Sequence, residues 1–208
     1  PQRSLANNSA VYMEKPSPPE FMEEWLALAK SGSGERGVFN RGGLKHQVPS
    51  RRWKVLKNTL LPTEVPPGTN PCGEIILQSK QFCNLTEVVA RAEDTEESLL
   101  RKARLATILG TYQSTLTNFP YLSKEWARNC NEERLLGVSV TGQWDCPAVR
   151  NTETLKKMRE ESIRVNKEYA ARFGIAPSTS ITCVKPSGTV SQLVDSSSGM
   201  HPRHAKYY

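Results

Sequence analysis

The sequence lacks the features that mark several specialised classes of protein. No apolar run approaches the roughly 20 residues that a membrane-spanning helix needs, and the chain does not start with a basic segment followed by an apolar one. Aromatic residues make up only 7% of the 208 residues, and there is no internal repeat. With 37% apolar and 24% charged residues, the composition is that of an ordinary globular protein and excludes disordered and collagen-like classes. We therefore expect a soluble, cytoplasmic protein.

Cysteine pairs with metal-binding or redox spacing are also absent. The five cysteines form no C-x-x-C pair, and their spacing to the three histidines is not that of a zinc site. The odd number argues against a disulfide framework, and we expect no metal site. Unless one of them takes part in chemistry, we expect all five to be reduced thiols. They are Cys72, Cys83, Cys130, Cys146 and Cys183.

The chain has an excess of basic residues, with 28 Lys+Arg against 21 Asp+Glu and a net charge of +7. Such an excess can indicate a nucleotide or nucleic-acid partner. The basic residues are dispersed, however, and no alternation of aromatic and basic residues follows the densest cluster, Arg51–Lys54. We therefore favour a solvated basic surface and expect no direct binding of nucleic acid.

The two ends of the sequence resemble the interior of a protein. The first methionine is Met13, within a segment that already looks organised, and the chain stops at Tyr208 without a polar tail. We expect the 208 residues to be an internal piece of a longer chain.

Capping residues and hydrophobic spacing predict four helices. Ser17 before Pro18 is typical of a helix start, and Gly32 and Gly174 are typical of helix ends. The second helix combines an apolar stripe with small residues that allow a neighbour to approach closely: Leu105, Leu109, Tyr112 and Leu116, and Ala103, Ala106 and Gly110. The expected ranges are 18–31, about 94–118, 123–133 and about 152–173.

Short apolar runs predict three strands, at 74–77, 135–141 and 181–184. Residues 32–50 are rich in glycine and indicate turns, and four prolines within 58–71 indicate a shaped loop. Because long helices separate the strands, the fold class is α/β, with a largely parallel sheet or barrel.

One group of polar residues surrounds a cysteine in the proline- and glycine-rich loop. Asn70, Cys72 and Glu74 would project to one side if the segment were extended, which would bring together an amide, a thiol and a carboxylate. Such a set can orient a substrate, perform sulfur chemistry and act as a general base. The residues alone leave another interpretation open, with Cys72 a small buried apolar residue and Glu74 a surface charge.

A second candidate site follows the last expected strand. Ser187, Gly188 and Thr189 offer two hydroxyls and closely spaced backbone N–H groups that can bind a phosphate. A tight turn uses the same residues, and the segment is not the longer P-loop pattern. His201 and Arg203 could add positive charge or lie on the surface.

These segments resemble a known family when they are read together. Asn70–Leu77, followed by Gln81–Leu85, is similar to the active-site finger loop of ribonucleotide reductases, in the form of the monomeric, adenosylcobalamin-dependent (class II) ribonucleoside-triphosphate reductases. Lys185–Ser191 resembles the phosphate-binding turn of that family. Further similar segments are Asn7–Ser9, Phe39–Arg41, Gly137–Gly142, Gly199–Arg203 and Tyr207–Tyr208.

The resemblance implies a fold and an organisation. In this family an α/β barrel of ten strands, built from two five-stranded halves, surrounds a central finger loop. Residues 1–208 would form a partial catalytic barrel domain, with the finger loop at about 68–74 and the phosphate-binding turn at about 185–191.

The resemblance also implies residue roles. Cys72 matches the cysteine that becomes a thiyl radical and abstracts the ribose 3′ hydrogen, Glu74 the carboxylate that takes the 3′-OH proton, and Asn70 the amide that holds substrate hydroxyls. Cys83 matches one of two thiols that reduce the 2′ position, and its partner would lie outside this chain. Ser187, Gly188 and Thr189 match the phosphate ligands. The remaining cysteines lack the family's flanking residues and are expected to be structural.

The implied activity is reduction of ribonucleoside triphosphates to deoxyribonucleotides, with adenosylcobalamin as cofactor, thioredoxin or another dithiol as reductant, and a dNTP effector. The isolated chain is expected to be inactive. Two alternatives stay open: a dimeric class II or iron-dependent class I ribonucleoside-diphosphate reductase, and a non-catalytic basic module that binds nucleotides or nucleic acid.

Overall fold

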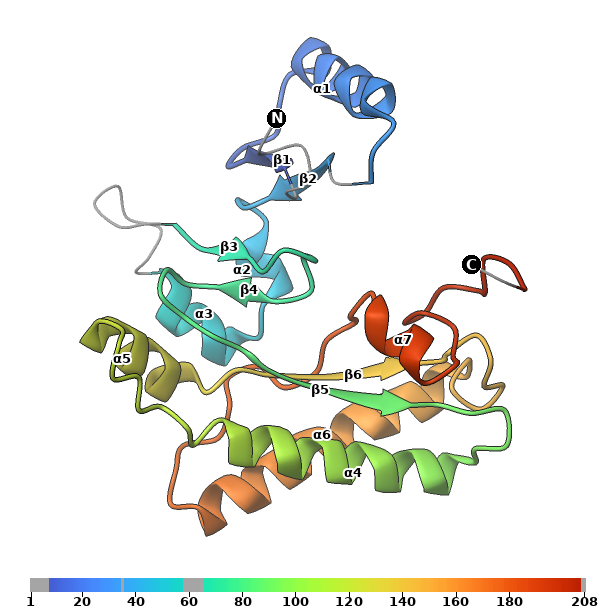
Figure 1. Ribbon diagram of the computed structural model, residues 1–208. Coiled ribbons are helices and arrows are strands. Elements are labelled where there is room, and N and C mark those ends of the chain that lie inside the picture. The colour runs from blue at the N-terminus through green and yellow to red at the C-terminus, as the bar shows by residue number, and fades with distance from the viewer. Residues whose placement is uncertain (1–7, 35, 58–65, 207–208) are drawn as a thin grey trace. The chain divides into compact units, whose positions relative to one another are not determined.

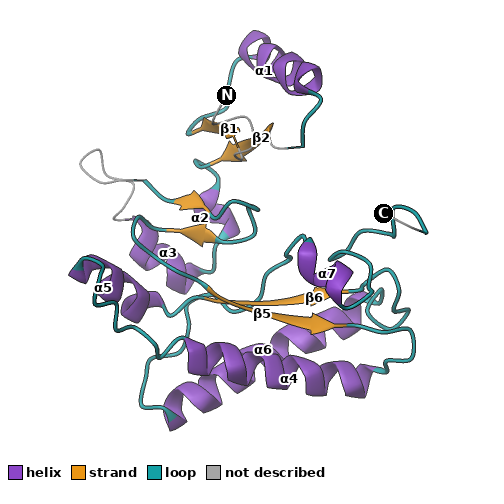
Figure 2. Ribbon diagram, viewed as in Figure 1, coloured by secondary structure: helices purple, strands orange, loops and turns teal. Residues whose placement is uncertain are grey.

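Helices and short strands alternate along residues 8–34, 36–57 and 66–206, the part of the chain that the computed structural model describes (Figure 1). The motif residues Asn7, Tyr207 and Tyr208, and Pro62 of the expected loop, lie outside this part. The chain divides into two units, 1–76 and 77–208. The α/β class predicted from the sequence is confirmed (Figure 2), while the assignment of all 208 residues to one barrel domain stays a prediction.

The first unit begins with two parallel strands joined by a helix. Strands β1 (Asn8–Tyr12) and β2 (Arg36–Asn40) pair in register from Asn8 opposite Arg36 to Tyr12 opposite Asn40. Helix α1 (Pro18–Ser31) has the predicted bounds, because the Ser17 Oγ accepts a hydrogen bond from the Glu20 N–H at 3.4 Å and Gly32 ends the helix at φ +59°. The sequence did not predict strand β2. It lies within the glycine-rich range 32–50, for which turns were expected.

The apolar face of α1 is exposed. None of the helix's residues is buried among the described residues, and Phe21, Trp25 and Leu26 are all more than a third exposed. Capping and propensity therefore specify this helix locally, without a core of its own.

The rest of the first unit leads to the expected finger loop. It contains α2 (Leu44–Gln47), α3 (Ser50–Leu56) and β3 (Gly68–Thr69), which pairs with β4 (Ile76–Leu77), where the boundary between the units falls. Arg52, which we expected on a solvated basic surface, is 2% exposed, and its guanidinium donates to the Ile76 carbonyl. Strand β4 is shorter than the predicted strand 74–77, because the chain turns and bends through Ile75.

The second unit is built on a parallel strand pair and two long helices. Strands β5 (Asn84–Val89) and β6 (Leu136–Thr141) pair in register along their whole length. Between them in sequence lie α4 (Glu96–Gln113) and α5 (Lys124–Glu133), and α6 (Thr152–Arg172) follows β6. Helices α4 and α6 lie side by side along the strand pair (Figure 1).

The core of the second unit lies where α4 faces β6 and α6. It contains Val88, Leu99, Ala103, Leu136, Val138, Val149 and Met158. At Gly110 an added Cβ would lie 3.2 Å from the Leu136 side chain, so the predicted close approach through small residues is confirmed. The predicted apolar stripe lies outside this contact: Leu105, Leu109 and Tyr112 of α4, and Leu116 beyond its end, are each more than half exposed. The helix also ends at Gln113, earlier than predicted.

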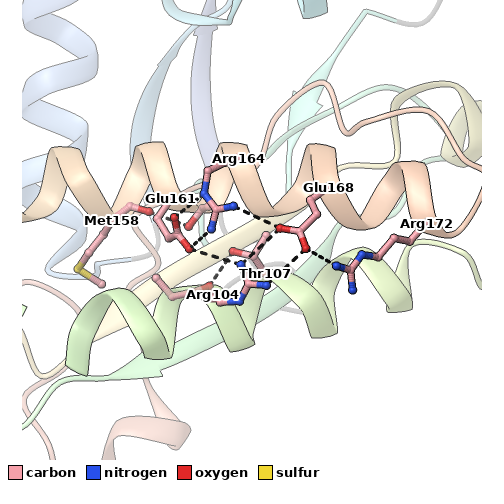
Figure 3. A network of polar contacts seen from close by, with 9 residues as sticks. Arg104, Thr107, Met158, Glu161, Arg164, Glu168 and Arg172 are labelled. Atoms are coloured by element: carbon pink, nitrogen blue, oxygen red, sulfur yellow. Dashed lines mark hydrogen bonds and ion pairs between the residues drawn. The ribbon is translucent and has the colours of Figure 1, made fainter. Parts of the chain in front are cut away.

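Charged side chains join α4 to α6 on the outside of this core (Figure 3). Arg104 of α4 lies 3.5 Å from Glu168 and 3.7 Å from Glu161, both on α6. Arg164 contacts the same two carboxylates, and the hydrogen bond from Arg104 leads the contributions that lower the pKa of Glu168. Exposed pairs of this kind contribute little stability singly, and here Arg104 is the residue of the network that links α4 to α6.

The predicted strand 181–184 is wrong. Thr182 forms only an isolated parallel bridge with Val138, through hydrogen bonds from Val138 N to Ile181 O at 2.8 Å and from Cys183 N to Val138 O at 3.1 Å. The ladder stops there because the next N–H that faces β6, that of Lys185, donates to the Ser139 side-chain Oγ at 3.1 Å and not to a backbone carbonyl. A short helix that the sequence did not predict, α7 (Thr189–Leu193), follows. No helix in the described part of the chain is long and apolar enough to cross a membrane.

Candidate functional site

The candidate finger loop is a tight turn. The Asn70 N–H donates to the Ile75 carbonyl at 3.1 Å, the Ile75 N–H donates to the Asn70 Oδ1 at 2.9 Å, and the Gly73 N–H donates to the Asn70 carbonyl at 2.9 Å. Gly73 has φ +81°, a conformation that favours glycine. The segment is therefore not extended, and the side-by-side projection of Asn70, Cys72 and Glu74 along a strand is wrong.

The turn presents Cys72 at its tip. The cysteine is exposed, whereas Glu74 is half-buried. The interpretation of Cys72 as a small buried apolar residue is therefore wrong. Asn70 holds the turn together through its Oδ1, and its amide group can still donate from Nδ2.

A pocket of about 390 Å³ adjoins the turn within the first unit. The loop residues Thr69–Gly73 line one part of it, and Ser9, Arg36, Phe39 and Arg41 of the β1–β2 region line another. Arg41 Nε donates to the Pro67 carbonyl at 2.8 Å, and its guanidinium lies 5.8 Å from the centre of the Phe39 ring. The Arg36 guanidinium pairs with Glu24 at 2.7 Å, so the positive character of the pocket comes from Arg41. The motif Phe39–Arg41, for which the sequence suggested no role, thus contributes to the lining.

The other candidate residues belong to the second unit. Cys83 is half-buried and comes directly before β5. Its neighbour Asn84 is fixed by two hydrogen bonds to the Leu135 carbonyl, from N at 2.9 Å and from Nδ2 at 2.8 Å.

The candidate phosphate-binding turn leads into α7. Ser187 is 1% exposed, and its Oγ has no hydrogen-bond partner among the described residues. Gly188 precedes the first residue of the helix, Thr189, which is exposed. A buried hydroxyl without a hydrogen-bond partner is costly in free energy. Of the three predicted phosphate ligands, Ser187 is therefore the one that a bound ligand would satisfy.

Two serines that the sequence did not single out organise this turn. Ser191 Oγ lies 2.7 Å from the carbonyl oxygens of both Ser187 and Gly188 and shares its one proton between them, and Ser198 Oγ donates to the Ser187 carbonyl. Both line a hollow of about 340 Å³ together with Ser187, Gly188 and Gln192. Ser191 could have been found, because it closes the motif Lys185–Ser191.

Arg203 forms ion pairs with two carboxylates of its own chain. It lies 2.7 Å from Asp195 and 3.1 Å from Asp145, which also accepts a hydrogen bond from the Ser197 N–H at 2.7 Å. Burial opposes ionisation of Asp145, but Ser197 and Arg203 outweigh burial and lower the pKa of this carboxyl. We first considered Arg203 as a source of positive charge for a ligand. In the structure its guanidinium binds two carboxylates of its own chain.

Two other cysteines are buried within the second unit. Cys146 belongs to the core cluster, and Cys130 on α5 has its pKa raised by burial. Within the described ranges, no group of three or more His, Cys, Asp and Glu side chains could hold a metal ion.

Comparison with known proteins identifies relatives of this chain. No family model matches the sequence. Adenosylcobalamin-dependent ribonucleoside-triphosphate reductases are similar: that of Lactobacillus acidophilus is 31% identical over 170 residues, covering 67% of this chain and 22% of the relative. Those of Euglena gracilis and Levilactobacillus brevis are 30% and 29% identical and cover 68% and 84% of this chain, and 20% and 26% of the relatives.

Two solved structures are also similar. A B12-dependent class II ribonucleotide reductase has a TM-score of 0.51 and 27% identity, over 64% of this chain and 22% of that one. The class Id ribonucleotide reductase alpha subunit of Actinobacillus ureae has a TM-score of 0.65 over 92% of this chain and 41% of that one, and at 19% identity it speaks to the fold alone. The chain spans about a quarter or less of the length of the three ribonucleoside-triphosphate reductases from L. acidophilus, L. brevis and E. gracilis.

Proposed function

Because this chain belongs to the ribonucleotide reductase family, we propose that it forms part of an adenosylcobalamin-dependent ribonucleoside-triphosphate reductase. The full polypeptide would reduce ribonucleoside triphosphates to 2′-deoxyribonucleoside triphosphates in the cytoplasm. A dithiol such as thioredoxin would supply the electrons, and a dNTP would act as effector.

The observation that carries this proposal is the exposure of Cys72 at the tip of the turn, beside a pocket that Arg41 also lines. A thiol that must exchange a hydrogen atom with a substrate needs access, and a nucleotide needs positive charge nearby. A cysteine placed only for packing would be buried.

Each residue of the turn has a role in this proposal. Cys72 abstracts the ribose 3′ hydrogen as a thiyl radical, because the S–H and activated C–H bonds are close enough in strength for the step to reverse. Glu74 takes the 3′-OH proton as general base, and Asn70 holds substrate hydroxyls through its Nδ2 while its Oδ1 keeps the turn closed.

Cys83 and the turn before α7 complete the proposal from the second unit. Cys83 is one of the two thiols that reduce the 2′ position and end as a disulfide. Ser187, Gly188 and Thr189 bind substrate phosphate, which would give the buried Ser187 hydroxyl a hydrogen-bonding partner.

The exposed Cys72 thiol is accessible to a cofactor that generates a radical next to the turn. When bound, adenosylcobalamin supplies the radical by homolysis of its cobalt–carbon bond. Cys72 is the residue of this chain that would receive it.

A diphosphate-specific relative, dimeric class II or iron-dependent class I, is the alternative within the family. The names of the similar proteins favour the triphosphate type. A non-catalytic nucleotide-binding module is the alternative from another class, and it predicts that replacing Cys72 has no effect.

The test is anaerobic conversion of a ribonucleoside triphosphate by the full polypeptide that contains this sequence, with a dithiol, and with or without adenosylcobalamin. We expect product only with the cofactor. Product without it, or only from a diphosphate, would replace this proposal with the alternative within the family.

Cys72→Ser should abolish turnover and leave nucleotide affinity unchanged, because serine keeps the shape but cannot form a thiyl radical. Cys183→Ser is the matched control and should stay active. Retention of more than about 5% of wild-type turnover by Cys72→Ser would contradict the enzyme proposal.

Glu74→Gln should lower kcat by about 100-fold or more, since general-base catalysis typically contributes a factor of this order. Cobalt–carbon cleavage, followed by absorbance, should persist in this variant. Loss of cleavage would argue against the role of Glu74 as the base.

A further inference from the structure

Helix α5 holds the segment that leads from the finger loop to Cys83. Asn129 Nδ2 donates to the Ser79 carbonyl at 2.9 Å, and the Lys80 ammonium pairs with Glu125. Lys80 itself adopts φ +55°, which is rare for a residue with a side chain. These contacts fix the path of the chain at the start of the segment.

The residue directly before Cys83 is held by the same helix. The Phe82 ring stacks on Trp126 of α5 at 4.6 Å between ring centres, and the Phe82 N–H donates to Cys130 Sγ at 3.4 Å. Since Asn84 is fixed to the Leu135 carbonyl, Cys83 lies between two anchored neighbours.

A buried carboxylate lies at the end of α5. Glu133 is fully buried, and its Oε2 accepts hydrogen bonds from Gln78 Nε2 and Gln81 Nε2, both at 2.8 Å. Its Oε1 accepts one from Thr179 Oγ1 at 2.9 Å. Gln81 in turn accepts from the Gln78 N–H at 2.9 Å, so that the segment folds back on itself around Glu133.

The chemistry of this site calls for a group that only accepts hydrogen bonds. A carboxylate accepts on both oxygens and carries a charge that strengthens each bond, whereas a glutamine would keep one neutral acceptor oxygen and turn its NH₂ group toward the Thr179 hydroxyl. Burial of a carboxylate is costly, and three side-chain donors offset that cost here. The gain must therefore lie in what Glu133 organises.

We propose that Glu133 is a positioning residue for Cys83: it gathers Gln78, Gln81 and Thr179 around one carboxylate and so fixes the segment that carries the thiol. This inference rests on the proposed function for the role of Cys83. The carboxylate itself touches no substrate and acts through the segment 78–84.

The test is the alkylation rate of Cys72, Cys83 and Cys146 in Glu133→Gln, measured by competitive labelling and mass spectrometry of the full polypeptide that contains this sequence. We expect labelling of Cys83 to accelerate about tenfold, because a neutral amide oxygen binds Gln78 and Gln81 more weakly than a carboxylate does and so opens the segment locally. The rates at exposed Cys72 and buried Cys146 should stay within about twofold of the parent. Glu132→Gln, the same change one residue away, should alter none of them.

Two results would overturn the proposal. The first is an unchanged rate at Cys83 in the folded variant. The second is a parallel rise at Cys146, which would show that Glu133 stabilises the whole unit and does not position one segment. If Glu133→Gln does not fold, Thr179→Val is the second test, because it removes one hydrogen-bond donor to Glu133 and keeps the shape of the side chain. We expect the alkylation rate of Cys83 alone to rise about threefold. An unchanged rate would overturn the proposal.

Kinetics of the full polypeptide separate this inference from the proposed function. In an active enzyme, Glu133→Gln should lower kcat about tenfold with KM unchanged, because Cys83 acts after substrate binds; an unchanged kcat would overturn the positioning role. An inactive wild-type enzyme would count against the proposed function, and the labelling result would still decide whether Glu133 fixes Cys83.

Discussion

The two units of this protein use the same local plan with different results. In both, a helix follows one strand of a parallel pair and precedes the other: α1 between β1 and β2, and α4 between β5 and β6. Helix α4 buries six of its residues, whereas α1 buries none among the described residues. Periodicity and caps are thus sufficient to specify a helix, but the neighbouring elements decide whether its apolar face is buried.

The two units also differ in where they place a reactive cysteine and where they place a core. The exposed cysteine of the finger loop belongs to the first unit, where few side chains are buried, and the continuous core belongs to the second. Regions with few buried apolar contacts open at low cost in free energy. The second unit should therefore carry most of the stability of the chain.

The largest expected effect tests that statement directly. Leu136→Ala, at a fully buried position in β6, should lower the free energy of unfolding by about 4 kcal/mol, because it leaves a cavity against Gly110. Leu26→Ala in α1, at an exposed leucine, should change it by no more than about 0.5 kcal/mol. Urea unfolding followed by circular dichroism measures both, and equal losses would contradict the comparison.

Two glycines with positive φ give a smaller and more specific contrast. At Gly142 (φ +76°) an added Cβ would lie 2.4 Å from the Ala90 carbonyl oxygen, whereas at Gly73 (φ +81°) nothing lies within 4 Å. Gly142→Ala should cost about 3 kcal/mol, from strain and displaced backbone together.

Gly73→Ala should cost about 1 kcal/mol, from backbone strain alone. Thermal unfolding of the two variants checks the order. A larger loss at Gly73 would mean that the finger-loop turn contributes more to stability than its surroundings indicate.

The smallest expected effect is the loss of folding stability at acid pH. Burial opposes ionisation of Asp94 and Asp145, but hydrogen bonds and cations outweigh it and lower both pKa values: Lys102 and Ser98 at Asp94, Ser197 and Arg203 at Asp145. A carboxyl whose pKa is lowered on folding stabilises the protein above its unfolded pKa, and that stability is lost as pH falls through the folded pKa. Stability should therefore decline below about pH 4.

Asp145→Asn should flatten this decline, because the amide cannot titrate. Glu160→Gln, the same type of change at an exposed position of α6, is the control. Urea unfolding from pH 6 to pH 3 measures the slope, and an unchanged slope in Asp145→Asn would contradict the assignment.

Local signals predicted the helices well and the strands less well. The ranges 18–31 and 123–133 agree with α1 and α5 to within a residue, and the Ser17 side chain caps the first of these helices as predicted. The predicted strand 181–184 is only a bridge, since a strand depends on the partner that its backbone finds, and an apolar run does not specify that partner.

The candidate site shows the same division. Its motif residues could be named from sequence because their spacing is local, as in Asn70, Cys72 and Glu74. Glu133 and Ser198 could not, since each acquires its role from partners 11 to 55 residues away. The turn at Gly73 was also missed, because alternation of polar residues is compatible with both a strand and a turn.

The contacts of Arg203 have a consequence for how the sequence can vary. One guanidinium binds Asp145, 58 residues away, and Asp195, eight residues away, and also donates to the Asp195 carbonyl. A lysine has no planar fork with which to serve three acceptors at once. Between related chains, we expect these three positions to covary: replacement of the arginine should be accompanied by loss of one or both aspartates.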